Sequence, residues 1–279
     1  GPVGCCGFFQ PSSELVNSYR TDDSGLPLLS GAYNDPGNVV TDDDGKESDD
    51  NSFVEDTGNL DPRLDWTVGR RGIPYYDWGV HPGKAWIRNQ TYGGPYSPKK
   101  NVYRKSQTGQ YVDQSWPGGP LNASNYTMIR FADIILWLAE CEVEVGSLDK
   151  AREYVNMIRA RAANPGGFVR ESDSNNASAN YVIGLYAAGY PFDNRENARI
   201  AVHFERKLEL AMEGHRFFDL VRWGEAPNTI EAYLNYEKTK RVESLKDARF
   251  DAGMDEYFPI PQLQIDLMGQ SILKQNPGY

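Results

Sequence analysis

The stretch ERKLELAMEGHRFFDLVRWGEA, Glu205 to Ala226, places acids, arginines, a histidine and a tryptophan within a few helical turns. Glu205, Glu209 and Glu213 are spaced at i, i+4 and i+8, so a helix would carry all three on one face. Two carboxylates that cleave a glycosidic bond must instead flank it from opposite sides, about 5 to 9.5 Å apart. We therefore interpret these glutamates as an ion-paired scaffold, and we predict no catalytic residue.

The residues around this stretch predict a long helix followed by a short one. Apolar residues recur at helical spacing along the long helix, forming one stripe: Ile200, Phe204, Leu208 and Ala211. Gly214 is expected to end or bend this helix, because glycine is common just after the last helical residue.

A pair of helices is predicted further upstream. Its apolar positions again follow helical spacing: Met128, Ala132, Ile135 and Ala139, then Leu148, Ala151, Val155, Ile158 and Ala162. Gly146 and Ser147 between the two runs suit a C-terminal glycine and an N-cap. The pattern is typical of one tetratricopeptide unit, although no second copy follows at a period of about 34 residues.

The composition changes near Asn125. Glycine, proline, aspartate and aromatic residues dominate before it, without sustained periodicity, whereas helical periodicity dominates after it. We predict a mostly α protein in which a loop-rich irregular lobe, residues 1–124, packs on a helical lobe, residues 125–279. The two lobes are expected to form one integrated domain, and the ligand loops are expected in the first.

Charge and cysteine content narrow the classes of protein. The 279-residue chain has a formal net charge of -10, which argues against a nucleic-acid partner because phosphate binding needs a concentrated basic face. No apolar run approaches the roughly 18 residues of a transmembrane helix. Cys5, Cys6 and Cys141 are too few and too unevenly placed for a disulfide framework.

One acidic run raises the question of metal binding. TDDDGKESDD, Thr41 to Asp50, clusters the carboxylates that hard cations prefer. If Gly45 held the sharp turn of an EF-hand loop, Val40 and Asn51 would occupy its first and last ligand positions, and neither is suitable. We predict a solvated loop and no cofactor, with an irregular structural calcium site as the alternative. The histidines lack metal-ligand spacing and are predicted to be structural: His81, His203 and His215.

Aromatic residues gather in the segment VGRRGIPYYDWGVHPGKAWIRNQTYGGPY, Val68 to Tyr96. Flat rings stack on the apolar faces of sugars while arginine and asparagine bind hydroxyl groups, and loops allow such side chains to converge. The competing interpretation is that the rings pack the loops against the helices. From this clustering we predict the following ligand-binding residues: Tyr33, Tyr75, Tyr76, Trp78, Trp86 and Arg88.

Five long segments carry specific motifs. They are CCGFFQPSSELVNSYRTDD, LDPRLDWTVGRRGIPYYDWG, NYTMIRFADIILWLAECEVEVGSLDKAREYVNMIRARA, ENARIAVHFERKLELAMEGHRFFDLVRWG and YFPIPQLQIDLMGQSILKQNPGY. Together they closely resemble the RagB/SusD family of Bacteroidetes outer-membrane proteins. The resemblance runs from end to end but corresponds to about the C-terminal half of a typical member. The half that carries the signal peptide, the lipid-bearing cysteine and most tetratricopeptide-like helices is expected to lie outside this chain.

The resemblance implies a function. Members are surface-exposed, lipid-anchored proteins of the cell outer membrane, without enzyme activity, that capture glycans or other nutrients. They deliver the ligand to a SusC-like TonB-dependent transporter. The alternative is a protein-interaction module that contacts the transporter, with the ligand contacts in the absent half. Trp66 lies in the family-like segment DPRLDWT and is expected in the core.

Overall fold

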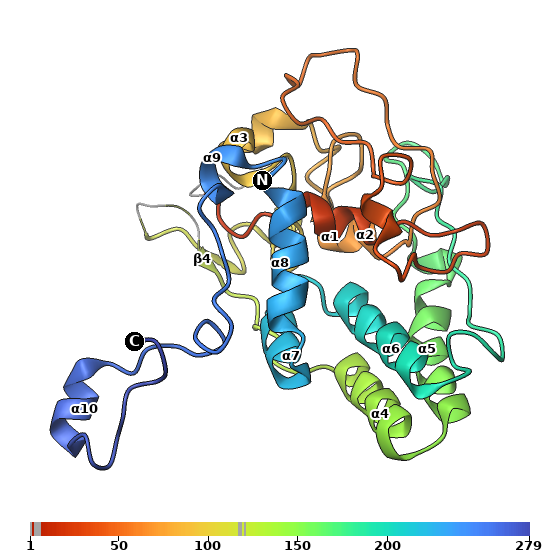
Figure 1. Ribbon diagram of the computed structural model, residues 1–279. Helices are drawn as coiled ribbons and strands as arrows, with labels where there is room; N and C mark the ends of the chain where they lie inside the picture. Colours follow the sequence, from red (N-terminus) through yellow and green to blue (C-terminus); the bar gives the residue numbers. More distant parts are fainter. Residues whose placement is uncertain (1, 3–6, 117–118, 120) are drawn as a thin grey trace. The chain divides into compact units, whose positions relative to one another are not determined.

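The computed structural model describes residues 2, 7–116, 119 and 121–279, and it is mostly helical, as predicted (Figure 1). It comprises two compact units, Gly1–Gly214 and His215–Tyr279. The division near residue 125 that the composition indicates stays a prediction. Cys5 and Cys6 lie outside the described residues, and Cys141 is an exposed free thiol.

The first unit begins with about 130 residues in which the elements are short. Its α-helices are α1 (Ser13–Asn17), α2 (Leu64–Thr67) and α3 (Gln90–Gly93). Single 3-10 turns occupy Ala32–Asn34, Lys84–Trp86 and Lys105–Gln107. Two small antiparallel sheets pair β1 (Val68–Gly69) with β2 (Ser97–Pro98) and β3 (Val112–Asp113) with β4 (Leu121–Asn122). The remaining backbone lies in turns and loops, as the glycine and proline content predicts.

Three long helices form the rest of the first unit. They are α4 (Phe131–Val145), α5 (Leu148–Ala162) and α6 (Arg195–Glu209), and they contact one another (Figure 1). The predicted helix pair is confirmed: Gly146 follows α4, and the Ser147 side chain accepts a hydrogen bond from the Lys150 amide at the start of α5. A 3-10 turn, Pro165–Gly167, follows α5.

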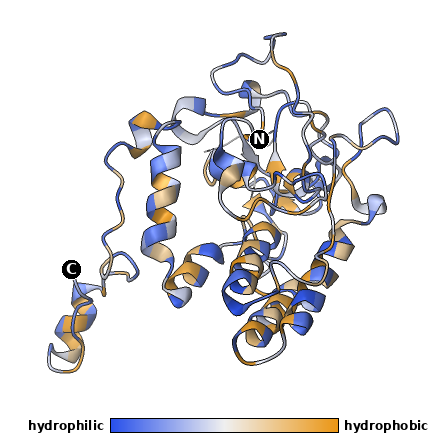
Figure 2. Ribbon diagram, turned by 45° about the vertical axis from the view of Figure 1, so that its right-hand side comes forward, coloured by the Kyte–Doolittle hydropathy of each residue, from blue (hydrophilic) through white to orange (hydrophobic). Residues whose placement is uncertain are grey.

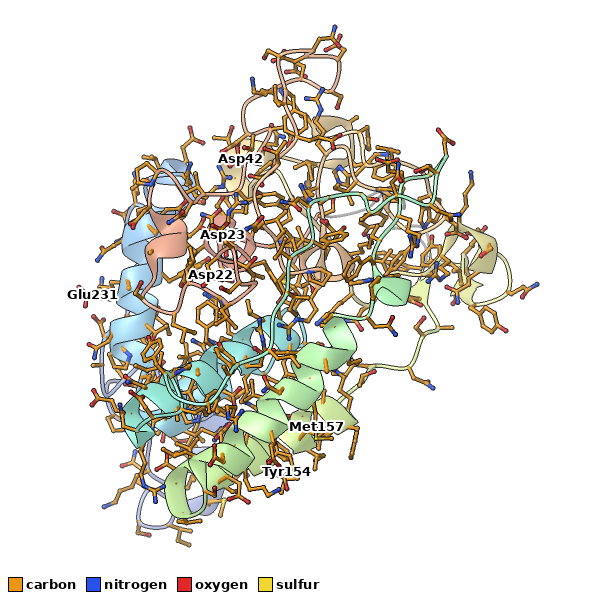
Figure 3. All side chains as sticks on the ribbon, turned by 90° about the vertical axis from the view of Figure 1, so that its right-hand side faces the viewer. Asp22, Asp23, Asp42, Tyr154, Met157 and Glu231 are labelled. Carbon is orange, nitrogen blue, oxygen red and sulfur yellow. The ribbon has the colours of Figure 1, made fainter. Side chains whose placement is uncertain are left out.

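Hydrophobic and hydrophilic residues alternate around these helices (Figure 2). Tyr186 and Phe192, from the loop before α6, join the inward side chains of these helices in one core cluster. The helix residues of the cluster are Ile135, Leu136, Ala139, Val143, Ala151, Val155, Ile158, Ala198, Ala201 and Val202. Met157 lies on the outer surface of α5 and is 50% exposed (Figure 3). Several apolar side chains of α4 are exposed as well: Phe131, Ile134, Trp137, Leu138 and Val145.

Helix α6 departs from the sequence prediction at its end. It stops at Glu209, five residues before Gly214, because Met212 and Gly214 both adopt positive φ angles of 62° and 85° that a right-handed helix does not allow. Phe204 and Leu208 are buried as expected, whereas Ile200 is 46% exposed. The apolar stripe is therefore shorter than the one predicted.

The second unit is a set of short helices. They are α7 (Arg216–Trp223), α8 (Ala226–Glu237), α9 (Val242–Leu245) and α10 (Gln262–Met268). Gly224, with a φ of 71°, ends α7 and allows the turn into α8. In the described residues of either unit, no helix combines the length and the apolar character that crossing a bilayer requires.

The acidic loop contains one buried carboxyl group. Asp42 lies on the loop surface (Figure 3), whereas Asp43 is only 2% exposed and its Oδ2 atom has no hydrogen-bond partner among the described residues. Burial raises the pKa of Asp43 to about 6, and the nearby charge of Arg71 only partly opposes this shift. Within residues 7–116, 119 and 121–279, no group of three or more His, Cys, Asp or Glu side chains is arranged to hold a metal ion.

Replacing Asp43 with asparagine is expected to stabilise the protein at neutral pH. Because the folded-state pKa of Asp43 lies above its ordinary value of 3.8, folding loses stability as the pH rises from about 4 to about 6. We expect Asp43→Asn to raise the Tm by about 2 to 4 °C at pH 7.5 and not at pH 4, measured by calorimetry. Asp49→Asn removes an exposed charge from the same loop and serves as the control. An equal shift in both variants would contradict the prediction.

Candidate ligand-binding groove

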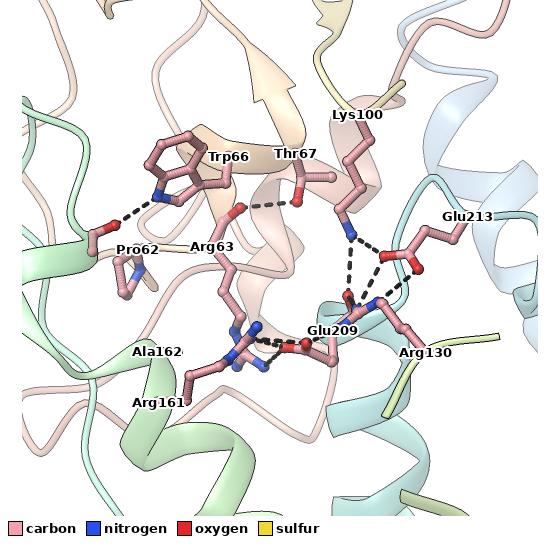
Figure 4. A pocket seen from close by; sticks show the side chains of 11 residues that line it. Pro62, Arg63, Trp66, Thr67, Lys100, Arg130, Arg161, Ala162, Glu209 and Glu213 are labelled. Carbon is pink, nitrogen blue, oxygen red and sulfur yellow. Dashed lines mark hydrogen bonds and ion pairs between the residues drawn. The ribbon is translucent and has the colours of Figure 1, made fainter. Parts of the chain in front are cut away.

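A cavity of about 440 Å³ opens on the first unit beside α2 and α5 (Figure 4). It is lined by Pro62, Arg63, Trp66, Thr67, Lys100, Arg130, Arg161, Ala162, Gly167, Glu209 and Glu213. A second hollow of about 240 Å³ shares three of these residues and adds Tyr76, Asn101, Tyr126 and Thr127. Because the two hollows share Lys100, Arg130 and Glu213, we treat them together as one groove.

Three aromatic rings line the groove, and each is held by a hydrogen bond from its polar edge. The Trp66 indole N–H donates to the Gly167 carbonyl at 2.7 Å, and the Tyr76 hydroxyl donates to the carbonyl of Lys99 at 2.9 Å. The Tyr126 hydroxyl donates to the carbonyl of Glu213 at 2.9 Å. Trp66 is 39% exposed and Tyr126 is 61% exposed, so both present ring surface to solvent.

Beneath the rings lies an ion-pair network. It consists of the carboxylates Asp61, Glu205, Glu209 and Glu213 with the cations Arg63, Lys100, Arg130, Arg159 and Arg161. Glu209 is its centre, because Arg130 and Arg161 contact it at 2.6 and 2.7 Å and Arg63 at 3.1 Å (Figure 4). The glutamates at i, i+4 and i+8 are thus ion-paired, as the sequence predicts.

Arg63 and Arg159 join the network to the core. Arg63 pairs with Asp61 and with Glu205, each at 2.6 Å, and Arg159 approaches the other oxygen of Glu205 at 3.0 Å. Arg159 also donates to the carbonyls of Gly25 and Gly184, each at 2.6 Å. One buried arginine therefore fastens two loops to α5 and α6.

The charges shift the pKa of the glutamates. Burial alone would raise the pKa of Glu209, but the positive charges of Arg63, Arg161 and Arg130 outweigh burial and lower it to about 2. For Glu213, burial is likewise outweighed by its contacts with Arg130 and Lys100, and the pKa is lowered. Both carboxyl groups are therefore ionised at neutral pH.

The six residues predicted to bind ligand occupy different places. Tyr76 lines the groove. Tyr75 is 1% exposed and its hydroxyl donates to the Pro98 carbonyl, and Tyr33 is buried against Phe204. Trp78 is half-buried and donates to the Tyr103 carbonyl at 3.0 Å.

The last two predicted residues lie elsewhere. Trp86 packs edge-on against His81 and Tyr75. Arg88 lines a separate cavity of about 390 Å³ together with Gly7, Phe8, Gln10, Asn89 and Tyr92. His81 is structural, as predicted, because its ring nitrogens interact with Ser97 and the Gly83 amide. The ligand contacts assigned from aromatic clustering stay a prediction.

Other groove residues were absent from the predicted set. Trp66 is half-exposed, which corrects its expected place in the core. Lys100, Arg130 and Arg161 lack a shared sequence pattern, because each comes from a different segment of the chain. One feature of the sequence could have pointed to a cationic groove residue: the pair Lys99 and Lys100 closely follows the aromatic segment.

Comparisons with known proteins place the chain in a family. SusD-like protein P25 of Formosa agariphila is 35% identical over 103 residues, which are 37% of this chain and 16% of that protein. SusD-like protein P2 of the same organism is 27% identical over 179 residues, 61% of this chain and 29% of that protein.

Solved structures share the fold. A SusD superfamily protein from Bacteroides vulgatus matches with a TM-score of 0.56 and 20% identity over 97% of this chain and 44% of its own length. A SusD-like protein from Bacteroides fragilis matches with a TM-score of 0.53 and 21% identity over 97% of this chain and 47% of its own length. The chain thus spans less than half the length of these relatives. Because its whole length, residues 1–279, also matches the SusD family, the chain belongs to that family.

Proposed function

We propose that this chain is part of a noncatalytic glycan-binding protein and that the groove holds the sugar. The observation that carries the proposal is the arrangement of Trp66, Tyr76 and Tyr126 around a cavity whose base is a network of ion pairs. Rings held at their polar edges keep their faces in place for stacking, and the fixed cations and Asn101 supply donors for sugar hydroxyl groups.

The ionisation of the groove carboxylates supports a noncatalytic role. A glycosidase needs one carboxylic acid that is still protonated near neutral pH, which requires a raised pKa. Glu209 and Glu213 are shifted in the opposite direction, and their oxygens are already occupied by cations. Neither side chain is placed to donate a proton to a leaving group.

Membership of the SusD family supports the wider setting of the proposal. In that setting the full-length protein is a lipid-anchored protein of the outer membrane, exposed at the cell surface. It passes bound oligosaccharide or another nutrient to a SusC-like TonB-dependent transporter. Co-purification of that transporter with the full-length protein tests this part separately from glycan binding.

A double variant of the groove aromatics tests the site. Each stacked ring contributes about 0.5 to 1.5 kcal/mol, so Trp66→Ala with Tyr126→Ala is expected to weaken glycan binding roughly 5- to 150-fold. Affinity gels and titration calorimetry with a panel of oligosaccharides measure the change. Tyr92→Ala removes an exposed ring from the separate cavity and is expected to leave the affinity unchanged. Loss of binding in the Tyr92→Ala variant alone would show that the ligand binds in the separate cavity lined by Arg88 and Tyr92.

The exposed apolar side chains of α4 favour a second candidate, a protein-interaction module. Contiguous apolar surface commonly marks a protein contact. On this candidate, the chain captures the cognate transporter in a pull-down and binds no glycan in the panel. Glycan binding that depends on the groove aromatics would count against it.

A further inference from the structure

The groove carries more positive charge than the rest of the protein would suggest. The chain has a formal net charge of -10, yet the ion-pair network joins five cations to four carboxylates. The network therefore keeps one positive charge in excess, at the base of an open cavity.

Arg161 presents part of that excess to the cavity. Its side chain is 58% exposed, and its Nη2 atom alone contacts both oxygens of Glu209, at 2.8 and 2.7 Å. Within the described part of the chain, its Nε and Nη1 atoms have no hydrogen-bond or ion-pair partner. Figure 4 shows this guanidinium beside Glu209 in the cavity. Arginine can bind an anionic group with two parallel N–H bonds, so it retains capacity for a second anion.

Two further cations contact the aromatic rings of the groove. The guanidinium of Arg104 lies 4.8 Å from the ring centre of Tyr76 and forms no ion pair among the described residues. The ammonium of Lys99 lies 5.6 Å from the Trp66 ring and 5.3 Å from the Tyr76 ring, and it donates to the backbone carbonyls of Asp65 and Pro74.

The nearby acids do not cancel these charges. The Asp65 carboxylate is bound by Arg70 at 2.7 Å and by the Tyr181 hydroxyl. The Asp77 carboxylate accepts hydrogen bonds from the amides of Lys105 and Ser106. The aromatic side of the groove is therefore also net positive.

We propose that the groove selects acidic glycans, those bearing carboxylate or sulfate groups, with two arginines as the anion contacts: Arg161, which lines the groove, and Arg104, which contacts the groove residue Tyr76. This inference rests on the proposed function, because it names the class of sugar that the groove binds. Stacking on Trp66 and Tyr126 holds the sugar ring, and the guanidinium groups of Arg161 and Arg104 bind its acidic substituent. In an acidic protein such a local charge also decides where an anionic chain can approach.

Matched pairs of oligosaccharides test the proposal. Oligogalacturonate is compared with its fully methyl-esterified form, and sulfated carrageenan oligosaccharide with its desulfated form, by titration calorimetry in 50 mM and 500 mM salt. At least one acidic member is expected to bind about tenfold more tightly than its neutral counterpart at low salt, and high salt is expected to reduce the difference. The pair that shows the preference tells carboxylate from sulfate recognition.

Three variants assign the preference to the groove. Arg161→Gln and Arg104→Gln are each expected to weaken the binding of the acidic member about 3- to 10-fold and to weaken the binding of its neutral counterpart by a smaller factor. Among the residues that the structure describes, Arg104 has no ion pair to lose, so its variant stays informative if Arg161→Gln disturbs folding. Lys150→Gln removes an exposed cation about 16 Å along α5 from Arg161 and is the control.

Each of three other outcomes would overturn a different part of the proposal. Equal binding of acidic and neutral members would overturn acid selection while glycan binding stands. An acidic preference that survives both arginine substitutions would place the contacts outside the groove and overturn the assignment. Absence of binding to any glycan would overturn the proposed function and this inference together.

Discussion

Replacing Glu209 with glutamine is expected to lower the free energy of unfolding by about 3 to 5 kcal/mol, the usual cost of breaking a buried ion pair from one side. Glu209 is 3% exposed and is contacted by Arg63, Arg130 and Arg161. A neutral amide leaves the buried guanidinium of Arg63 with less compensating charge and turns an acceptor into a donor facing other donors. Urea unfolding followed by circular dichroism measures the loss.

The pH dependence provides an internal check on this result. The folded-state pKa of Glu209, about 2, lies below its ordinary value of 4.5. Its charge therefore stabilises the fold above about pH 4.5, and that contribution is lost as the pH falls towards 2. The difference between wild type and variant should shrink over the same range. Glu153→Gln breaks the exposed pair with Lys150 and should cost less than about 1 kcal/mol; a similar cost for both variants would contradict the central role of Glu209.

Replacing Arg159 with methionine is expected to have an effect of similar size. Methionine fills much of the same space but removes the charge opposite Glu205 and the donors to the carbonyls of Gly25 and Gly184. Buried acceptors that lose a partner cost about 1 to 3 kcal/mol each, so a total loss of about 3 to 5 kcal/mol is expected. Urea unfolding gives the stability, and amide hydrogen exchange should show faster exchange in the two loops.

A matched control separates these contacts from a general effect of the substitution. Arg199→Met breaks an exposed ion pair with Glu144 on the surface of the same unit. It is expected to change the stability by less than about 1 kcal/mol. If Arg159→Met proved no more costly than Arg199→Met, the proposed fastening of the loops would be wrong.

The helices illustrate what local patterns can predict. The boundary between α4 and α5 follows from Gly146 and Ser147, because helix caps depend on residues next to one another in the chain. The ion-paired role of Glu205 and Glu209 also follows from their spacing on α6, whereas Glu213 lies beyond the end of that helix. The end of α6 was misplaced by five residues because Met212, which no pattern marks, adopts a left-handed conformation.

The groove shows the limit of the same reasoning. Aromatic clustering found Tyr76 but also selected Tyr75, whose ring the fold buries, and it assigned Trp66 to the core. Composition counts aromatic rings, but burial depends on what packs above each ring. Tyr76 lies in a turn and has a positive φ of 52°, so its side chain leaves the backbone in another direction than that of Tyr75, and the two rings have different environments although they are adjacent.

The sequence by itself determined the helical class, the helix pair and the SusD family, because caps, periodicity and long motifs are properties of neighbouring residues. The tertiary structure alone decided which side chains line the groove. Its walls come from segments far apart, and Arg63 and Glu209 are separated by 146 positions. A charged side chain that becomes buried needs a partner of opposite charge, because an unpaired buried charge is costly. Which charges become buried together depends on the packing of the whole unit, and no local pattern in the sequence records it.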